Sequence, residues 1–241
     1  MIPIGDEGTP AQRGLPIVNL TIIALNILMF IVQVMLGDPF TNGWSLIPRE
    51  ITTGQDLTGV FPVPGFDAQI ELTGAPLGIP YLTLLTSMFM HGGLLHIGSN
   101  MLFLFIFGDN VEDNFGSLKY LIFYLACGLG ASFAQIFLGD PTSVIPNVGA
   151  SGAIAGVMGA YIVLFRQARV RVLIPLGRIS TVNAVPAFFM IGIWIATQLL
   201  SVFVLEEQTT GGGVAYWAHI GGFVAGLLLV FLFRDSQRDM G

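Results

Sequence analysis

The chain has 241 residues, of which 54% are hydrophobic and only 10% are charged, and its mean hydropathy is +0.78. A soluble domain carries roughly 25% charged residues, so this composition excludes an ordinary soluble protein and indicates a membrane protein. The net charge of −6 argues against a nucleic-acid partner, which would need a basic face. Cys127 is the only cysteine, which rules out an intrachain disulfide.

Six apolar stretches follow one another along the chain, and each one predicts a membrane-spanning helix. They cover residues 17–36, 94–107, 121–138, 151–165, 185–204 and 214–233. The first stretch is close to the ~20 residues of a span and no small-residue cleavage site follows it, so we expect a retained anchor. The predicted fold class is therefore all-α, a polytopic membrane protein with a bundle of six transmembrane helices.

The basic residues fall almost entirely on one side of this arrangement. That side holds Arg13, Lys119, Arg166, Arg169, Arg171, Arg178, Arg234 and Arg238, whereas Arg49 falls on the other. Because Lys and Arg accumulate on the cytoplasmic side, we predict a cell-membrane protein with both termini in the cytoplasm. Residues 1–14 and 235–241 would be short cytoplasmic tails around a membrane domain at 15–234.

Three loops are then predicted to face outward, at residues 37–93, 139–150 and 205–213. The first is the longest connection, and its apolar content favours packing against or partly into the membrane. The third is polar and glycine-rich, which makes it a candidate for a mobile lid just before His219.

Ser151 begins the shortest apolar stretch. About fifteen residues separate it from Arg166, which at ~1.5 Å per residue is ~22 Å, against a hydrocarbon thickness of ~30 Å. If the basic end stays at the cytoplasmic surface, Ser151 lies below the outer surface and water needs a recess to reach it. A helix N-terminus also presents unpaired N–H groups and a partial positive charge. We therefore predict acyl transfer with Ser151 as the nucleophile.

Small residues indicate which helices touch. Gly152, Gly156 and Ala160 recur every four residues after Ser151, and Gly222 and Gly226 form a Gly-x-x-x-Gly pair in the sixth stretch. Such stripes allow close approach between membrane helices. His219 shares the face of Gly222 and Gly226, so it is expected to meet Ser151 and to act as its general base, later protonating the leaving amine.

His96 and Asn100 are four residues apart, so they share one face of the second predicted helix. Both can donate hydrogen bonds. Together with the Ser151 backbone N–H they are predicted to form an oxyanion hole. For His91, in the preceding turn, a structural hydrogen bond is the better interpretation.

Three runs of residues carry a resemblance to a known family. They are HGGLLHIGSN at 91–100, GASG at 149–152 and AHIGGFVAG at 218–226. In this order, on the second, fourth and sixth predicted helices, they resemble the signature motifs of the rhomboid intramembrane serine proteases. The resemblance covers roughly residues 17–233 and implies the family's compact six-helix form.

The resemblance implies an intramembrane serine endopeptidase with a Ser-His dyad, in which Ser151 is the nucleophile and His219 the base. His96 and Asn100 match the positions that join the serine backbone in holding the oxyanion. The implied substrates are single-span membrane proteins, cut in or near a transmembrane segment in the lipid bilayer at a site that opens toward the outer face. No cofactor, metal or nucleic acid is expected.

Two further positions bear on the resemblance. Glu112 matches a recurrent family position that is expected to be structural. Some family members carry an aromatic residue four positions after the serine, where it stacks on the catalytic histidine, but this chain has Ala155 there. The sequence therefore does not show which residue stacks on the His219 ring.

Three other interpretations stay open at this stage. A transporter or channel could relay protons through buried histidines, although the predicted helix interiors contain no Asp or Glu to partner them. A zinc protease could use His91, His96 and His219 as ligands, but the His-Glu-x-x-His motif is absent. A catalytically inactive relative could bind membrane clients, and the presence of both Ser151 and His219 counts against it.

Overall fold

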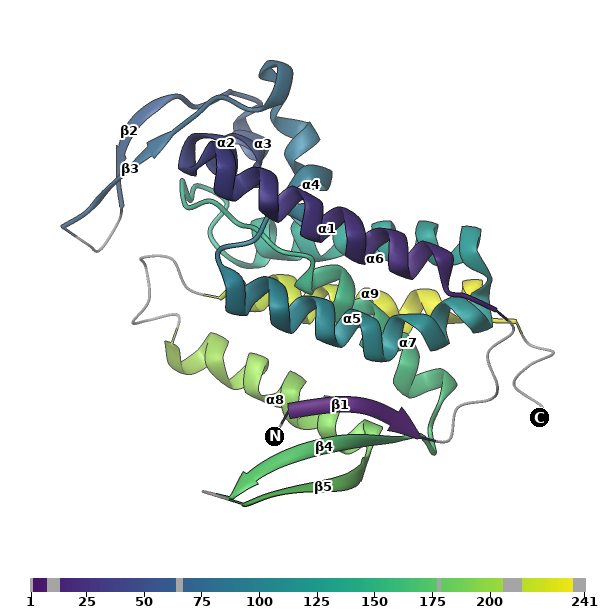
Figure 1. Ribbon diagram of the computed structural model, residues 1–241. Coiled ribbons are helices and arrows are strands. Elements are labelled where there is room, and N and C mark those ends of the chain that lie inside the picture. Colours follow the sequence, from purple (N-terminus) through teal and green to yellow (C-terminus); the bar gives the residue numbers. More distant parts are fainter. Residues whose placement is uncertain (1, 8–13, 64–66, 177–178, 206–213, 236–241) are drawn as a thin grey trace.

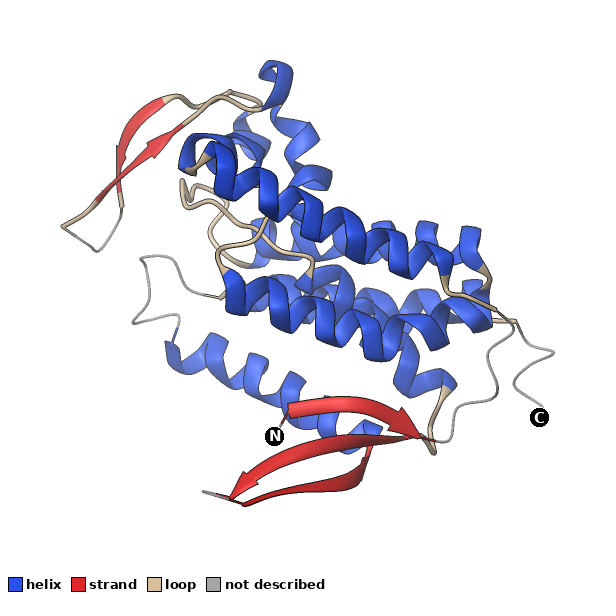
Figure 2. Cartoon of the chain, viewed as in Figure 1, coloured by secondary structure: helices blue, strands red, loops and turns tan. Residues whose placement is uncertain are grey.

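The computed structural model describes residues 2–7, 14–63, 67–176, 179–205 and 214–235, and these are mostly helical (Figures 1 and 2). Among these residues, four helices are long and apolar enough to cross a membrane. They are α1 (Ile17–Leu36), α5 (Leu94–Phe115), α6 (Ser117–Leu138) and α9 (Tyr216–Phe233). They coincide with the first, second, third and sixth predicted spans, as expected of a membrane protein.

The fourth and fifth predicted spans correspond to two shorter apolar helices, α7 (Ser151–Leu164) and α8 (Ala187–Leu205). The 14 residues of α7 measure ~21 Å at ~1.5 Å per residue. This is less than the ~30 Å of a hydrocarbon core, so a full crossing by these two helices stays a prediction.

The short helix α7 lies at the centre of the bundle (Figure 1). It packs against α5, α6, α8 and α9, and residues 152–161 are all buried. A helix that is apolar on every side is stable only when it is surrounded. The position of α7 therefore follows from its composition, and it brings Ser151, at its first turn, into the interior of the protein.

Glu112 connects three of the long helices. Its carboxylate accepts hydrogen bonds from the backbone N–H groups of Val18 and Asn19, at 3.1 and 2.7 Å, and from the Ser117 hydroxyl. The first N–H groups of a helix have no partner inside the helix, and a negative charge is favourable there. Glu112 on α5 thus caps α1 and also holds the start of α6, which is the structural role expected for it.

Two small sheets correct the all-α prediction. A three-stranded antiparallel sheet has the order β1 (Ile2–Glu7), β4 (Arg169–Leu176), β5 (Ile179–Pro186), and a hairpin joins β2 (Gly59–Pro62) to β3 (Gln69–Leu72). In β4, Val170 and Val172 are buried while Arg169 and Arg171 alternate with them. This alternation is the period of a half-buried strand. In the sequence, the arginines were used only to predict the cytoplasmic side, and the strand was therefore missed.

The N-terminal strand β1 is fixed to the helices by Asp6. The Asp6 carboxylate accepts hydrogen bonds from the Tyr161 hydroxyl of α7, at 2.8 Å, and from the Asn110 amide of α5, at 3.0 Å. Residues 2–7, expected to belong to a short tail, thus lie beside the ends of these helices and pair with β4. The side of the membrane on which this sheet lies stays a prediction.

The long loop between α1 and α5 is folded rather than irregular. It contains α2 (Asp38–Trp44), α3 (Pro48–Thr53), the β2–β3 hairpin, α4 (Thr83–Thr86) and short 3₁₀ turns at Pro76–Gly78, Pro80–Leu82 and Ser87–Phe89. It contacts the loop before α7, because Leu46 and Asn147 form a β-bridge and the Arg49 N–H donates to the Ser143 carbonyl at 3.0 Å. Both loops therefore lie at the end of the bundle where Ser151 begins α7.

Glu50, on α3 of this loop, is an acidic side chain that is only 1% exposed. One carboxylate oxygen accepts the Leu57 N–H at 2.9 Å. Burial raises the pKa of Glu50 from 4.5 to about 7, the nearby Asp56 charge acts in the same direction, and the Leu57 hydrogen bond opposes them. Glu50 is thus a group that changes charge near neutral pH inside the loop between α1 and α5.

Candidate active site

Ser151 is the first residue of α7, and the chain reaches it through Gly149. Gly149 has φ +133, a conformation that favours glycine, and its N–H donates to the Ser87 carbonyl at 2.9 Å. A Cβ atom at Gly149 would lie 2.9 Å from His96 Nε2 and 3.4 Å from Ser151 Oγ. Because glycine has no side chain, a space stays open beside Gly149, and both His96 Nε2 and Ser151 Oγ border it.

His219 lies in the first turn of α9, and its position follows from the contact between α7 and α9. The backbones of these helices touch, because a Cβ atom at Gly222 would overlap the Gly152 carbonyl oxygen and one at Gly226 would overlap the Gly156 carbonyl oxygen. The prediction that the two glycine stripes face each other is confirmed. His219, one turn before Gly222, is only 8% exposed and points toward α7.

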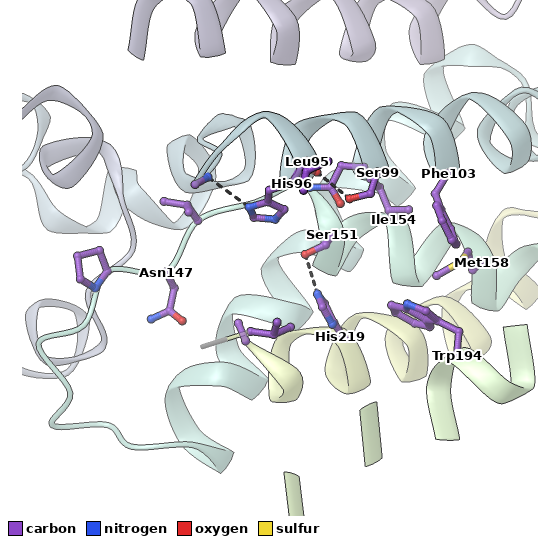
Figure 3. Close-up of a pocket in the computed structure, with 16 residues that line it drawn as sticks. Leu95, His96, Ser99, Phe103, Asn147, Ser151, Ile154, Met158, Trp194 and His219 are labelled. Carbon is purple, nitrogen blue, oxygen red and sulfur yellow. Dashed lines mark hydrogen bonds between the residues drawn. The ribbon is translucent and has the colours of Figure 1, made fainter. Parts of the chain in front are cut away.

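The Ser151 hydroxyl and the His219 ring meet between these helices, as Figure 3 shows. Ser151 Oγ lies 2.7 Å from His219 Nε2, which is within hydrogen-bond distance for proton transfer. In the tautomer that leaves Nε2 unprotonated, the hydroxyl donates to this nitrogen. The structure thus brings together the two side chains that the sequence assigns to nucleophile and base.

The other face of His219 is held by α8, through two residues that the sequence analysis did not single out. Gln198 Oε1 lies 2.7 Å from His219 Nδ1. The Trp194 ring lies against the imidazole, with ring centroids 5.4 Å apart and an interplanar angle of 40°. Ala155, on α7, has no ring to stack on the imidazole. The aromatic contact to His219 is made by Trp194 of α8. A glutamine one turn after a tryptophan, within an apolar stretch, was the available signal.

His96 is oriented by the backbone of the turn before α5. The Gly92 N–H donates to His96 Nδ1 at 3.2 Å, so in the neutral imidazole the proton sits on Nε2. Nε2 faces the space beside Gly149 and Ser151 Oγ. His96 thus presents an N–H donor near the serine, in the place where an oxyanion donor is predicted.

Asn100 lies one turn further along α5 and lines the same space. It is 7% exposed, and its amide nitrogen has no hydrogen-bond partner among the described residues. A buried amide without a partner is costly. A ligand oxygen that formed on this side of Ser151 would satisfy it, so its geometry fits the predicted oxyanion role.

His91 is placed differently from the other two histidines. Its backbone N–H and C=O are both bonded to the Gln33 side chain of α1, at 2.9 and 3.1 Å. Its ring is buried and packs edge-on against the His96 ring, with centroids 5.1 Å apart. The backbone bonds fix the turn before α5, whereas both ring nitrogens have no hydrogen-bond partner among the described residues. A structural role for the His91 ring therefore stays a prediction.

A cavity of roughly 690 Å³ opens beside the dyad. Its wall includes the polar side chains of the dyad and of His96, Ser99, Asn100 and Asn147. Apolar side chains line it as well, among them Phe103, Ile154, Met158 and Trp194 (Figure 3). Sites that hold organic ligands combine an apolar lining with a few placed polar groups. The cavity can therefore admit water and an extended peptide segment with apolar side chains.

The described residues include no group of three or more His, Cys, Asp or Glu side chains arranged to hold a metal ion. The zinc interpretation required three histidines to converge. Instead, His219 Nε2 faces the Ser151 hydroxyl and Nδ1 faces Gln198. The candidate lid at 205–213 lies, from residue 206, outside the described residues.

Comparison with known proteins gives a consistent result. A family model described as the Rhomboid domain matches residues 80–236. The chain is 33% identical to RHOMBOID-like protein 4 of Arabidopsis thaliana over 150 residues, which are 62% of this chain and 33% of that protein. It is 32% identical to Rhomboid protease GluP of Bacillus subtilis (strain 168) over 154 residues, which are 64% of this chain and 26% of that protein.

A third relative is Rhomboid protein 1, mitochondrial, of Saccharomyces cerevisiae (strain ATCC 204508 / S288c). It is 28% identical over 157 residues, which are 61% of this chain and 40% of that protein. The chain thus spans between about a quarter and two fifths of the length of these three relatives.

Proposed function

Because the chain belongs to the rhomboid family, we propose that it is an intramembrane serine protease that hydrolyses peptide bonds in or near transmembrane segments of membrane proteins. The observation that carries the proposal is the 2.7 Å approach of Ser151 Oγ to His219 Nε2, between two helices of the bundle. A serine hydroxyl alone is a weak nucleophile, and a neighbouring neutral histidine activates it.

In the first half of the proposed reaction, Ser151 Oγ attacks the carbonyl carbon of the scissile bond while its proton passes to His219 Nε2. The carbonyl oxygen becomes an anion beside the donors of His96 and Asn100 and the Ser151 backbone N–H. Donors that are held in place before reaction stabilise this charge more than they stabilise the substrate.

The intermediate then collapses, the C–N bond breaks, and the protonated His219 gives its proton to the leaving amine. The acyl group remains on Ser151 as an ester. A water molecule from the cavity attacks this ester, His219 takes the water proton, and a second oxyanion forms at the same donors. This second intermediate collapses, the bond between the acyl carbon and Ser151 Oγ breaks, and the protonated His219 gives its proton back to Oγ. The new carboxyl end is released and the enzyme is regenerated.

The apolar helices indicate where the reaction takes place. The proposed orientation has both termini in the cytoplasm of a cell-membrane protein, and the cavity then opens toward the outer face. The apolar lining by residues such as Phe103, Ile154 and Met158 suits a membrane-derived segment that has partly unwound. Single-span membrane proteins are therefore the proposed substrates.

The test is cleavage of a single-span reporter protein reconstituted in liposomes with the purified chain. Cleavage by the natural sequence, its loss in Ser151→Ala and in His219→Ala, and its persistence in chelator would support the proposal. Cleavage that chelator abolishes would point to a metal mechanism. Solute flux through the liposomes without cleavage would favour a transporter, and neither activity would favour an inactive, client-binding relative.

A further inference from the structure

The apolar helix α8 carries one amide side chain that points at the proposed base. Gln198 is 9% exposed, and its Oε1 atom lies 2.7 Å from His219 Nδ1. Ser151 is bonded to the opposite nitrogen of the same ring. The imidazole is therefore held at both nitrogens, from α7 on one side and from α8 on the other.

The orientation of the Gln198 amide follows from the contacts of its nitrogen atom. Its nitrogen faces two acceptors on its own helix, the Thr197 hydroxyl oxygen at 3.2 Å and the Trp194 carbonyl at 3.4 Å. The Thr197 hydroxyl itself donates to the Trp194 carbonyl at 2.6 Å, which leaves its lone pairs for the amide. With the nitrogen occupied there, the amide oxygen must face the ring.

This orientation determines where the His219 proton sits. An amide oxygen can only accept, so the ring donates from Nδ1, and in the neutral imidazole Nε2 keeps its lone pair toward Ser151. If the ring took the other tautomer, Nε2 would carry a proton and could not accept one from the serine. The hydrogen bond from Nδ1 thus selects the form of His219 that acts as a base.

We propose that Gln198 is a positioning residue that fixes the tautomer and the direction of the His219 ring, an inference that rests on the proposed protease function. Aspartate plays this part in soluble serine proteases and also stabilises the imidazolium by charge. Gln198 orients the His219 ring through a hydrogen bond but carries no charge. A displacement of α8 from α9 would remove the acceptor from Nδ1.

No charge compensates the imidazolium on the sides of His219 that the structure describes. Its titratable neighbour is His96 on α5. The groups of α7 and α8 that contact the ring are uncharged, namely Ser151, Trp194 and Gln198. A carboxylate introduced at position 198 would be the first anion in contact with the ring, and it would stabilise the protonated imidazole directly.

The experiment measures how fast a fluorophosphonate labels Ser151, as a function of pH, in the purified chain in liposomes. This rate reports activation of the serine and needs no knowledge of the substrate. We expect Gln198→Met to lower the rate roughly tenfold to a hundredfold, as does loss of a hydrogen bond that orients a functional histidine. We expect Gln198→Glu to retain labelling but to move the midpoint of its rise with pH upward by about one unit or more.

Gln135→Met is the matched control. Gln135 on α6 accepts the Ala218 N–H at 3.1 Å, so this variant also removes a glutamine bond to the first turn of α9, but not one to the His219 ring. Its pH midpoint is expected to stay that of the natural sequence. If Gln198→Met fails to fold, the nearly isosteric Gln198→Glu still decides the matter through its pH midpoint.

The outcomes separate this inference from the proposed function. Normal labelling of the natural sequence, with Gln198→Met within twofold and Gln198→Glu at an unchanged midpoint, would overturn the positioning role alone. An equal midpoint shift in the Gln135 control would overturn it as well, because the effect would then be a general one on α9. Absence of labelling in the natural sequence would overturn the proposed function and this inference together.

Discussion

The contact between α7 and α9 differs from the contact between α8 and α9 in what holds it together. In the first, the main chains touch at Gly152–Gly222 and Gly156–Gly226, and no flexible side chain lies between them. In the second, Trp194 and Gln198 of α8 reach the His219 ring. The distance between nucleophile and base is thus fixed by backbones, whereas the orientation of the base depends on side chains.

The two contacts also differ in their surroundings. Residues 152–161 of α7 are buried, while α8 exposes apolar side chains such as Ile193 and Leu200, which are 48% and 63% exposed. On a membrane protein these are faces for lipid. The closely packed helices α7 and α9 therefore carry the reacting atoms, and the more exposed helix α8 adds the contacts that orient the His219 ring. Substitutions that separate the interior backbones should have larger effects than loss of the aromatic contact from α8.

Outside the Ser151–His219 pair itself, the largest effect is expected at Asn100, the buried donor on α5. Asn100→Ala should lower kcat about 10²–10³-fold with little change in KM, because removal of one oxyanion donor weakens binding of the transition state rather than of the substrate. Ser99→Ala is the neighbouring control, since Ser99 lines the same cavity but its hydroxyl already donates to the His96 carbonyl at 3.0 Å. Equal losses in the two variants would argue that Asn100 acts through packing.

The contact between α7 and α9 can be broken with a single methyl group. Gly226→Ala should overlap the Gly156 carbonyl, destabilise the protein by about 1–3 kcal/mol and slow labelling of Ser151 roughly a hundredfold, because small misplacements of reacting groups are costly. The matched control is Gly192→Ala on α8, where a Cβ atom would meet nothing within 4 Å. Thermal unfolding and labelling of both variants measure the contrast, which similar results would contradict.

A smaller effect is expected from the aromatic contact of α8. Trp194→Ala should slow labelling about tenfold or less, since an aromatic pair is worth ~0.5–1.5 kcal/mol beyond its burial, and Trp194→Phe should recover most of the rate. The rate constants of the two variants measure this directly. If Trp194→Ala matched the loss in Gly226→Ala, the proposed difference between interior and periphery would be wrong.

The smallest effect on chemistry is expected at Glu50, in the loop between α1 and α5. Because its pKa is raised to about 7, the folded protein holds this proton more tightly than the unfolded chain does. Its contribution to stability is present below about pH 4.5 and is lost as the pH rises through about 7. Glu50→Gln should therefore raise stability at pH 8 by about 1–3 kcal/mol and leave the labelling rate unchanged.

Unfolding of Glu50→Gln and of the natural sequence at pH 5 and pH 8 tests this sign. The exposed Glu71→Gln serves as a control in the same loop. A gain in stability that is equal at both pH values would show that the charge of Glu50 is not the cause.

The sequence was most informative where the spacing of residues along a helix determines which of them share a face. The Gly-x-x-x-Gly pair that follows His219 shows which face of α9 meets α7, and the start of the shortest apolar stretch places Ser151 at a helix N-terminus. His96 and Asn100, one turn apart, line one cavity with them. These relations depend on the helix period and on close backbone approach, which a sequence displays directly.

What the sequence did not show depends on contacts between distant elements. Gln198 and Trp194 stand in an apolar stretch, and nothing in that stretch says that its polar group faces α9 rather than a neighbouring turn. The strand β4 alternates Arg and Val, but it forms a sheet because β1 and β5 pair with it. Glu50 became buried only when the long loop folded. Each of these depends on tertiary packing, which local propensity does not determine.

The most direct measurement of the central claim is the site of fluorophosphonate modification, located by mass spectrometry in the natural sequence and in His219→Ala. If a Ser151–His219 pair performs the chemistry, the reagent modifies Ser151 in the natural sequence, and His219→Ala reduces that modification by several orders of magnitude. Modification that is absent, lies on another residue, or persists undiminished in His219→Ala would contradict the account.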